Sequence, residues 1–386
     1  MQTRKKMAYF VILVAVFYVI FNRRSLYHYF IRPSCSRTEH FQTTFTHAQT
    51  NHSEKLILFY TSFFGKKPWI FAWEFSNYTE SCGCYFRGCK ITYEQNMYPV
   101  SDVVIFHGRN MPCVKTLVKL HSQRKHGQLW AYFNLENPLL TPSVKPLDDF
   151  FNLSISYKLK SEIHMPYRYH RRINFRKVGN TTKINYAIGK TKLVAWMVSN
   201  CNKLRDDLVR KLALYGIHVA VGGICKKHFR NRLNCISGNC TGELNKYKFY
   251  FAAENNLCKD YITEKYWENS LRRNLVPIVL GGANYSNPDL AIPGSYIDAM
   301  RFNNVRELAA YILKVNSDDK KYNEYFRWKE HWEVLKFQQG CNYFVCNLCQ
   351  KIQQKAIPTK SNSLSSVFQP SDCYGNEMFF KKWLQR

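Results

Sequence analysis

Residues 193–221 read LVAWMVSNCNKLRDDLVRKLALYGIHVAV, and this stretch contains one strand–helix–strand unit. The apolar run Leu193–Ser199 predicts a buried strand. Within Lys203–Tyr215 leucines recur at every fourth residue, which is the spacing of one helix face, and Gly216 then ends the predicted helix. Ile217–Val221 is apolar again and predicts a second strand. The alternation indicates an α/β domain in which the strands run parallel.

The same alternation recurs farther along the chain. The expected elements are a strand at Lys246–Ala252, a helix at Tyr261–Arg272, and a strand at Val276–Leu280 that ends at Gly281 and Gly282. The two glycines allow a sharp turn or a close approach of the backbone to a ligand, although a plain loop fits them nearly as well.

Three short apolar runs precede this block, at Leu56–Tyr60, Val103–His107 and Leu129–Phe133. Apolar runs without polar alternation suit parallel strands that are buried on both faces. Residues 178–190 hold Gly, Asn and Thr and are typical of a linker. We therefore expect an α/β fold class with two Rossmann-like domains that face a cleft. The expected segments are a first domain at 55–178, a second domain at 190–350 and a C-terminal segment at 351–386.

The N-terminal residues include the one stretch that could enter a bilayer. Met7–Phe21 has no charged side chain, and Arg and Lys residues flank it on both sides. We interpret residues 7–22 as an uncleaved transmembrane signal-anchor, after a cytoplasmic tail at 1–6 and before a stem at 23–54. A cleaved signal peptide is the alternative, but no small-residue cleavage site follows the apolar stretch. The positive flank before the span predicts a single-pass type II protein with its folded domains in the lumen.

Cysteines and glycosylation sequons agree with a secretory location. The chain has 14 cysteines, which favours disulfides in an oxidising compartment over the competing interpretation of Cys346-x2-Cys349 as a zinc half-site. Disulfide connectivity does not follow from the spacing. Six Asn-x-Ser/Thr sequons occur, at Asn51, Asn77, Asn152, Asn180, Asn239 and Asn284.

The chain is strongly basic. Subtracting 27 acidic from 56 basic residues gives a net charge of +29. A basic stretch at residues 158–177 favours a solvated surface, although it could also attract anionic glycans or a membrane surface. A protein that binds polyanions is therefore one hypothesis, whereas a lumenal location argues against nucleic acid as a partner.

Several signatures of nucleotide and hydrolase chemistry are absent. The sequence has no G-x-x-x-x-G-K-[ST], no G-x-G-x-x-G, no H-E-x-x-H and no G-x-S-x-G. It also has no Asp-x-Asp, the pair that holds a divalent metal in many sugar-nucleotide enzymes. If the chain handles a nucleotide sugar, its own cations must neutralise the diphosphate.

Residues 246–302 closely resemble the donor-binding motif of the α1,3-fucosyltransferases, the Lewis-type and core-type family. Two other segments are similar to the family more loosely, Trp130–Pro138 and Val194–Asn200. The matching positions within the motif are Glu254-Asn255, Leu257–Tyr261, Thr263–Lys265, Val276-Pro277, Val279–Gly281 and Pro293–Asp298.

This resemblance implies a fold and an activity. Enzymes of the family have the GT-B architecture and transfer L-fucose from GDP-fucose to a hydroxyl of N-acetylglucosamine, with inversion. On this basis we expect transfer to the 3-hydroxyl, with residues 55–178 on the acceptor side and 190–350 binding GDP-fucose in the Golgi lumen. The acceptor stays open between a lactosamine or LacdiNAc antenna and the innermost N-acetylglucosamine of an N-glycan. No cofactor is required in this interpretation, and modest stimulation by Mn²⁺ remains compatible with it.

The chain departs from the family pattern at a few positions. Asn137 and Asn256 stand where the family often has Ser, Ala253 stands where Phe is common, and residues 266–269 differ as well. These positions flank those to which the resemblance assigns roles, so they bear on acceptor preference rather than on donor binding.

Glu136 is the candidate general base, because it matches the family's carboxylate before Ser-Pro. It follows the apolar run Leu129–Phe133 and should lie at the carboxyl end of a strand, where open α/β sheets bind ligands. A nearby apolar wall would raise the pKa of Glu136 toward a useful value. The alternative is a solvated loop carboxylate.

Lys265 and Arg205 are the candidates that bind the diphosphate. Lys265 matches the lysine of the family's Thr-Glu-Lys element near a helix start, and Arg205 lies at the start of the helix after Leu193–Ser199. Helix amides and a guanidinium fork both suit phosphate. The alternative for each is a solvated helix face.

The resemblance also implies contacts with the rest of the donor. Glu264 would accept hydrogen bonds from ribose or fucose hydroxyls, and Tyr261 and Asn255 are candidate nucleotide contacts. A packed aromatic and a turn residue are the alternatives for the last two. His107, at a second strand end, could orient the acceptor hydroxyl, but a structural histidine is favoured. A non-catalytic lumenal lectin is the competing function, and the presence of all the matched charged residues argues against it.

Overall fold

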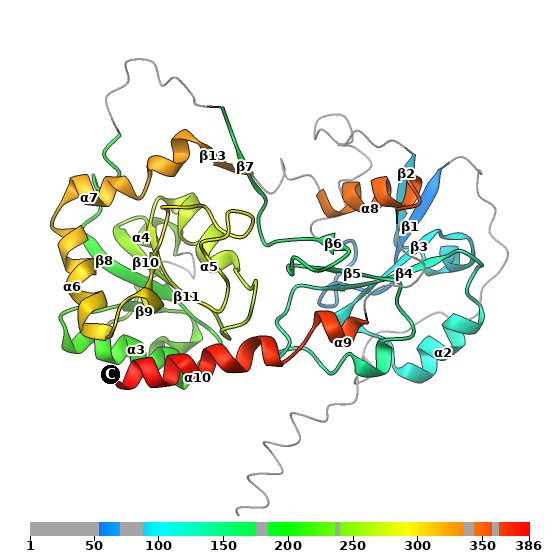
Figure 1. Ribbon diagram of the computed structural model, residues 1–386, viewed down its shortest axis with the longest axis horizontal. Coiled ribbons are helices and arrows are strands. Elements are labelled where there is room, and N and C mark those ends of the chain that lie inside the picture. Colours follow the sequence, from blue (N-terminus) through cyan, green and yellow to red (C-terminus); the bar gives the residue numbers. More distant parts are fainter. Residues whose placement is uncertain (1–53, 70–87, 175–183, 236–239, 336–342, 357–362) are drawn as a thin grey trace, which may run out of the picture.

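The structure is a computed structural model, and it describes residues 54–69, 88–174, 184–235, 240–335, 343–356 and 363–386. Two units, each built on a parallel sheet, lie side by side in Figure 1. Among the residues that are described, no helix is both long and apolar enough to cross a bilayer. Outside them lie the expected anchor, the expected stem up to residue 53, and four of the sequons, those at Asn51, Asn77, Asn180 and Asn239.

The first unit contains a six-stranded sheet with the order β2-β1-β3-β4-β5-β6, and every neighbouring pair is parallel. In the described part of the unit, the α-helices that cover this sheet are α2 (Val114–Ser122), α8 (Tyr343–Gln353) and α9 (Leu364–Val367). Its strands are β1 (Lys55–Phe59), β2 (Cys89–Thr92), β3 (Val103–His107), β4 (Leu129–Asn134), β5 (Leu153–Ser156) and β6 (Ile163–His164).

The apolar runs of this sheet are explained by burial on both faces. Ile57 and Phe59 of β1 pack in a cluster with α8, whereas Leu58 packs on the opposite face with α2 and α9. All five residues of β3 are buried. Successive side chains of a strand point to opposite faces, so a sheet that is covered twice requires apolar residues at nearly every position.

The second unit contains a five-stranded parallel sheet with the order β12-β11-β10-β8-β9. Its strands are β8 (Lys192–Met197), β9 (Ala220–Gly222), β10 (Tyr247–Ala253), β11 (Val276–Leu280) and β12 (Ile297–Asp298). The helices that pack on one face are α3 (Lys203–Leu214), α6 (Val305–Asn316), α7 (Asp319–Glu324) and α10 (Ser371–Gln385). The shorter helices on the other face are α4 (Thr241–Leu244) and α5 (Glu264–Trp267).

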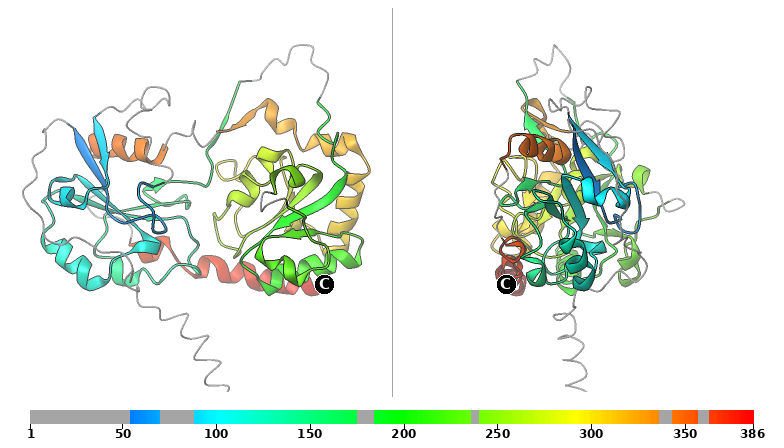
Figure 2. Two further views of the ribbon diagram at one scale, coloured as in Figure 1. Left: turned by 180° about the vertical axis from the view of Figure 1, so that it is seen from behind. Right: turned by 90° about the vertical axis from the view of Figure 1, so that its right-hand side faces the viewer.

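Additional connections hold these elements together. β7 (His170–Arg172) pairs antiparallel with β13 (Trp332–Val334) between the two units. Figures 1 and 2 show α10 running along the second unit while α9, just before it, lies against the first. The expectation of disulfides is confirmed by the pairs Cys89–Cys349, Cys201–Cys225, Cys235–Cys240 and Cys258–Cys373.

The expected α/β class with parallel strands is confirmed by both sheets. The predicted strands Val103–His107 and Val276–Leu280 coincide with β3 and β11. The strand expected at Ile217–Val221 is shorter and lies at Ala220–Gly222. Strong local patterns therefore located the strands, although their ends shift by a few residues.

The helix predicted at Tyr261–Arg272 is wrong. The helix here, α5, has four residues, because the backbone at Thr263 is extended and its side chain caps the amide of Lys265. At the other end the Ser270 hydroxyl donates to the Lys265 carbonyl at 2.7 Å. A side chain that takes a helix carbonyl competes with continuation of the helix, so the segment ends in a turn.

Helix α6 allows a matched test of the core. Leu308 is 0% exposed and Leu313, five residues later, is 39% exposed. We expect Leu308→Ala to lower the free energy of unfolding by about 2–5 kcal/mol, because it leaves a cavity, and Leu313→Ala to change it by less than about 0.5 kcal/mol. Urea denaturation measures both, and equal losses would contradict the assignment of α6 to the core.

Candidate active site

The carboxyl-terminal ends of the two sheets meet between the units. Tyr157, which follows β5, packs edge-on against Tyr261 in the segment after β10, with ring centroids 5.0 Å apart. The backbone N–H of Leu159 donates to Asp260 Oδ2 at 3.3 Å. Open parallel sheets bind their ligands at these edges. The junction is therefore the candidate active site.

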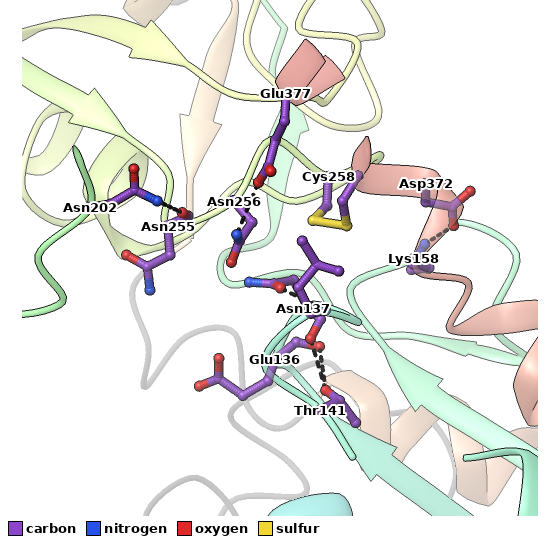
Figure 3. The surroundings of a disulfide bond; sticks show 12 residues. Glu136, Asn137, Thr141, Lys158, Asn202, Asn255, Asn256, Cys258, Asp372 and Glu377 are labelled. Atoms are coloured by element: carbon purple, nitrogen blue, oxygen red, sulfur yellow. Dashed lines mark hydrogen bonds and ion pairs between the residues drawn. A yellow bond between two sulfur atoms is a disulfide. The ribbon is translucent and has the colours of Figure 1, made fainter. Parts of the chain in front are cut away.

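Glu136 lies two residues after β4, with a half-buried side chain. Its backbone N–H donates to Asn134 Oδ1 at 3.0 Å, which holds the residue at the end of the strand. Figure 3 shows its carboxylate pointing away from the nearby disulfide. Burial raises the pKa of Glu136, and Arg109 and Lys265 oppose this rise while Glu264 adds to it. Glu136 from the first unit thus lies within electrostatic range of two charged residues of the second.

Arg205 is held rigidly at the start of α3, with 2% of its surface exposed. One terminal nitrogen donates to the Ala253 carbonyl and to Asn255 Oδ1, both at 3.1 Å, and the other donates to the Asn200 carbonyl. The guanidinium also lies over the Trp196 ring, 5.6 Å from its centroid. The buried Nε has no hydrogen-bond partner among the described groups. The structure therefore brings Arg205 and Asn255 together at the ends of β8 and β10.

Lys265 is buried in a network of two carboxylates and a hydroxyl. Its Nζ lies 2.9 Å from Thr263 Oγ1, 3.1 Å from Glu264 Oε1 and 3.2 Å from Glu254 Oε2. Burial alone would lower the pKa of Lys265, but the charges of Glu254 and Glu264 raise it. An ammonium has three N–H donors, and this network uses all of them.

Glu254 and Glu264 differ in what else they contact. Glu254 is buried and also accepts from the Thr263 N–H at 2.8 Å and the Thr263 hydroxyl at 2.7 Å. Glu264 leaves about half of its side chain exposed, 49%, and Lys265 is the partner through which it joins the network. Glu254 is therefore fixed, whereas Glu264 is the member of the network that can exchange its partner.

Tyr261 lies in a packed aromatic group. Its ring contacts Tyr157 and, at 6.1 Å between centroids, Tyr167, and its side chain is buried. The Tyr167 hydroxyl donates to the Leu135 carbonyl at 2.9 Å, next to Glu136. These three tyrosines form an aromatic contact between the units, and the charged groups of the site lie next to it.

His107 occupies a structural position. It is buried among aromatic rings, with Phe63 at 4.6 Å and Trp69 at 5.6 Å between ring centroids. Its Nδ1 lies 2.9 Å from Asn110 Oδ1. Burial lowers the pKa of His107 to about 4, so the ring is neutral at physiological pH.

Three residues at this junction had no role in the sequence analysis, Glu254, Arg109 and Tyr167. Glu254 stands inside the matched motif, so its place there was a usable signal, whereas Arg109 and Tyr167 carry no local pattern.

In the described part of the chain, no group of three or more His, Cys, Asp and Glu side chains gathers as metal ligands. The charged side chains near Glu136 and the donor-side network include the carboxylates of Glu136, Glu254 and Glu264 and the cations Arg109, Arg205 and Lys265.

Two family models match this chain, and each match contains the sheet of one unit. Residues 52–168 match "Fucosyltransferase, N-terminal", and residues 187–367 match "Glycosyltransferase family 10 (fucosyltransferase) C-term". The first match contains Glu136, and the second contains Arg205 and Lys265. The candidate site is therefore divided between the two matched regions.

Similar curated proteins carry fucosyltransferase names. The Bos taurus 3-galactosyl-N-acetylglucosaminide 4-alpha-L-fucosyltransferase FUT3 is 34% identical over 285 residues, which is 73% of this chain and 74% of that protein. The Homo sapiens 4-galactosyl-N-acetylglucosaminide 3-alpha-L-fucosyltransferase FUT6 is 32% identical over 69% of this chain and 72% of that protein. A solved alpha1,3-fucosyltransferase has a TM-score of 0.49 and 17% identity, covering 83% of this chain and 96% of its own.

The Glu254–Lys265 pair predicts unequal effects of two similar substitutions. Glu254→Gln should lower the free energy of unfolding by about 3–5 kcal/mol, because it leaves a buried ammonium without its buried counter-charge. Glu264→Gln should cost about 1 kcal/mol or less, because Glu264 is half-exposed. Urea denaturation of both variants measures this difference, and equal costs would show that Glu254 does not hold the network together.

Proposed function

The chain belongs to glycosyltransferase family 10, the fucosyltransferases, and we propose that it transfers L-fucose from GDP-fucose to the 3-hydroxyl of N-acetylglucosamine in N-glycans or other glycoconjugates. The observation that carries this proposal is that Glu136 from one matched region lies within electrostatic range of Lys265 and Glu264 from the other. The two units then act as the acceptor-side and donor-side domains of a GT-B enzyme.

Inversion requires a single displacement at the anomeric carbon. In the proposed reaction Glu136 removes the proton of the acceptor hydroxyl while the oxygen of that hydroxyl bonds to the anomeric carbon. The bond between the anomeric carbon and the GDP oxygen breaks at the same time. The proton stays on Glu136 and the electron pair leaves with GDP. A half-buried carboxylate with a raised pKa suits this step, because its basicity is higher than that of a solvated glutamate.

Arg205 and Lys265 are proposed to neutralise the leaving diphosphate. Arg205 is fixed by three oxygen acceptors, and its remaining N–H groups are available for a phosphate. Lys265 has no spare donor while Glu264 holds it. We therefore infer an exchange in which Glu264 turns to sugar hydroxyls of the donor and the freed N–H of Lys265 turns to phosphate. Charge that is held in place before the reaction costs little reorganisation during it.

The proposed compartment is the Golgi lumen, with the chain as a single-pass type II membrane protein. The disulfides of both units support an oxidising environment, where such bonds form and persist. The proposed anchor at residues 7–22 rests on the apolar sequence and its basic flanks.

A product assay with two acceptors tests the proposal. GDP-fucose is supplied with either a lactosamine acceptor or an N-glycan core acceptor, and GDP release and the fucosylated product are measured. Transfer to either acceptor supports the enzyme and identifies its acceptor class. Bound GDP-fucose without GDP release across a broad panel of N-acetylglucosamine acceptors would replace the transferase with a lectin.

Glu136→Gln should abolish transfer while GDP affinity is retained, because the amide cannot accept the proton. Glu94→Gln, an exposed position in the same unit, is the matched control and should transfer normally. Normal turnover of Glu136→Gln would remove Glu136 from the base role.

In the unaltered enzyme the acid limb of the pH profile of kcat/KM should lie above the pKa of an ordinary glutamate. Burial favours the protonated form of Glu136, and the base must lose that proton to act.

Lys265→Ala should weaken GDP binding by about 1.5–3 kcal/mol, the range of a charge-assisted hydrogen bond. Lys314→Ala, an exposed position on α6, should leave binding unchanged. Isothermal titration with GDP measures both, and a thermal melt of each variant shows whether it is folded. A folded Lys265→Ala variant with unaltered affinity would exclude contact between Lys265 and phosphate.

A further inference from the structure

The C-terminal residues 363–386, called the strap below, belong to both units. At its start, Leu364 and Val367 of α9 are buried in the core of the first sheet, and the Phe368 ring lies 5.3 Å from that of Tyr132. The Ser365 N–H donates to Asp148 Oδ1 at 2.7 Å. This end of the strap is therefore part of the first unit.

The other end of the strap is part of the second unit. Phe380, Trp383 and Leu384 of α10 are buried in the core of the second sheet. The Trp383 Nε1 donates to the Phe302 carbonyl at 2.6 Å. The family model ends at residue 367, so α10 lies beyond the region that matches the family.

Between these ends the strap passes through the candidate active site. The carboxylate of Asp372 forms an ion pair with Lys158, which follows β5 of the first unit and is 1% exposed. The next residue, Cys373, is disulfide-bonded to Cys258 of the second unit. Figure 3 shows both links beside each other, close to the loop that carries Glu136. Asp372 and Cys373 thus connect the two units within two consecutive residues.

Cys258, the disulfide partner of Cys373, lies in the segment that follows β10. This segment begins with Glu254 and Asn255, which hold Lys265 and Arg205. The Lys259 N–H donates to the Asp372 carbonyl at 3.0 Å, and Asn256 Nδ2 donates to Glu377 Oε1 at 3.0 Å. The strap is therefore bonded repeatedly to the loop that positions both candidate cations.

Separating the ion pair of Lys158 and Asp372 would carry an energetic penalty. A buried ammonium that loses its counter-charge is costly, so Lys158 holds Asp372 wherever the first unit places it. The disulfide then transfers that position to the loop of the second unit. Other contacts across the junction, such as the tyrosine rings, have no covalent link and can slide more easily.

We propose that Asp372 and Cys373 are positioning residues for fucosyl transfer, which set the register of the donor loop against Glu136 by bridging Lys158 and Cys258. This inference rests on the proposed function. The groups that bind GDP all lie in the second unit and keep their local partners without the bridge, whereas the base lies in the first. Loss of the bridge should therefore reduce kcat and spare GDP affinity.

The experiment compares three variants of the full-length chain, Cys258→Ser/Cys373→Ser, Asp372→Asn and Asp372→Glu. Removal of the Cys235–Cys240 disulfide by Cys235→Ser/Cys240→Ser is the matched control, since both cysteines lie within the second unit. The readouts are kcat for transfer, the share of GDP-fucose lost to water, the Kd of GDP and the melting temperature.

We expect the disulfide variant and Asp372→Asn to lose about 10- to 100-fold in kcat, the range for reacting groups displaced by about 1 Å. Both should retain the Kd of GDP and lose a larger share of donor to water. Asp372→Glu should recover part of kcat, because its carboxylate can still reach Lys158, and the control should keep the normal kcat.

A purely structural strap gives a different result, in which folded variants melt at lower temperature but turn over normally, and this result would overturn the proposal. If the disulfide variant fails to fold, the comparison of Asp372→Asn with Asp372→Glu decides in the same way. An unaltered chain that transfers to no N-acetylglucosamine acceptor would instead overturn the proposed function, before any variant is compared.

Discussion

The buried pair of Glu254 and Lys265 is the interaction on which the donor side of the site depends. A charge inside a protein is stable only when a partner and hydrogen bonds replace the lost water. Glu254 receives both from Thr263 and Lys265, which are nine and eleven residues farther along the chain. This network fixes the start of α5 against the end of β10, and with it the place of the cation.

The two parallel sheets explain why such charges gather at one place. Both faces of the central strands are covered by apolar side chains, so the charged side chains of the site lie beyond the strand ends. The junction brings the carboxyl ends of β4, β5, β8 and β10 together, and the strap crosses between the units at the same junction. Glu136 therefore lies within electrostatic range of Lys265, a cation that is encoded 129 residues later (265 − 136).

The sequence predicted those features that depend on local patterns. β3 and β11 follow from continuous apolar runs, because burial on both faces leaves a strong signal in a few residues. The predicted helix at Tyr261–Arg272 was wrong, because the hydroxyl of Ser270 competes for a helix carbonyl and periodicity does not register that competition.

Long-range pairing was beyond local inference. Lys158 belonged to a basic stretch that favoured a solvated surface, yet the structure buries it against Asp372, 214 residues away. The disulfide partners of the cysteines likewise could not be predicted from the cysteine spacing. For the candidate site, the predicted strands indicated where Glu136 and Arg205 lie in the fold. The contacts that hold Arg205 and Lys265 could be seen only in the structure.

A crystal structure with bound GDP-fucose measures the central claim most directly. The charge arrangement predicts the diphosphate within hydrogen-bonding distance of Arg205 and Lys265, Glu264 turned to the sugar hydroxyls, and Glu136 facing the anomeric carbon. A diphosphate that contacts neither Arg205 nor Lys265, or a fucose held on the far side from Glu136, would contradict it.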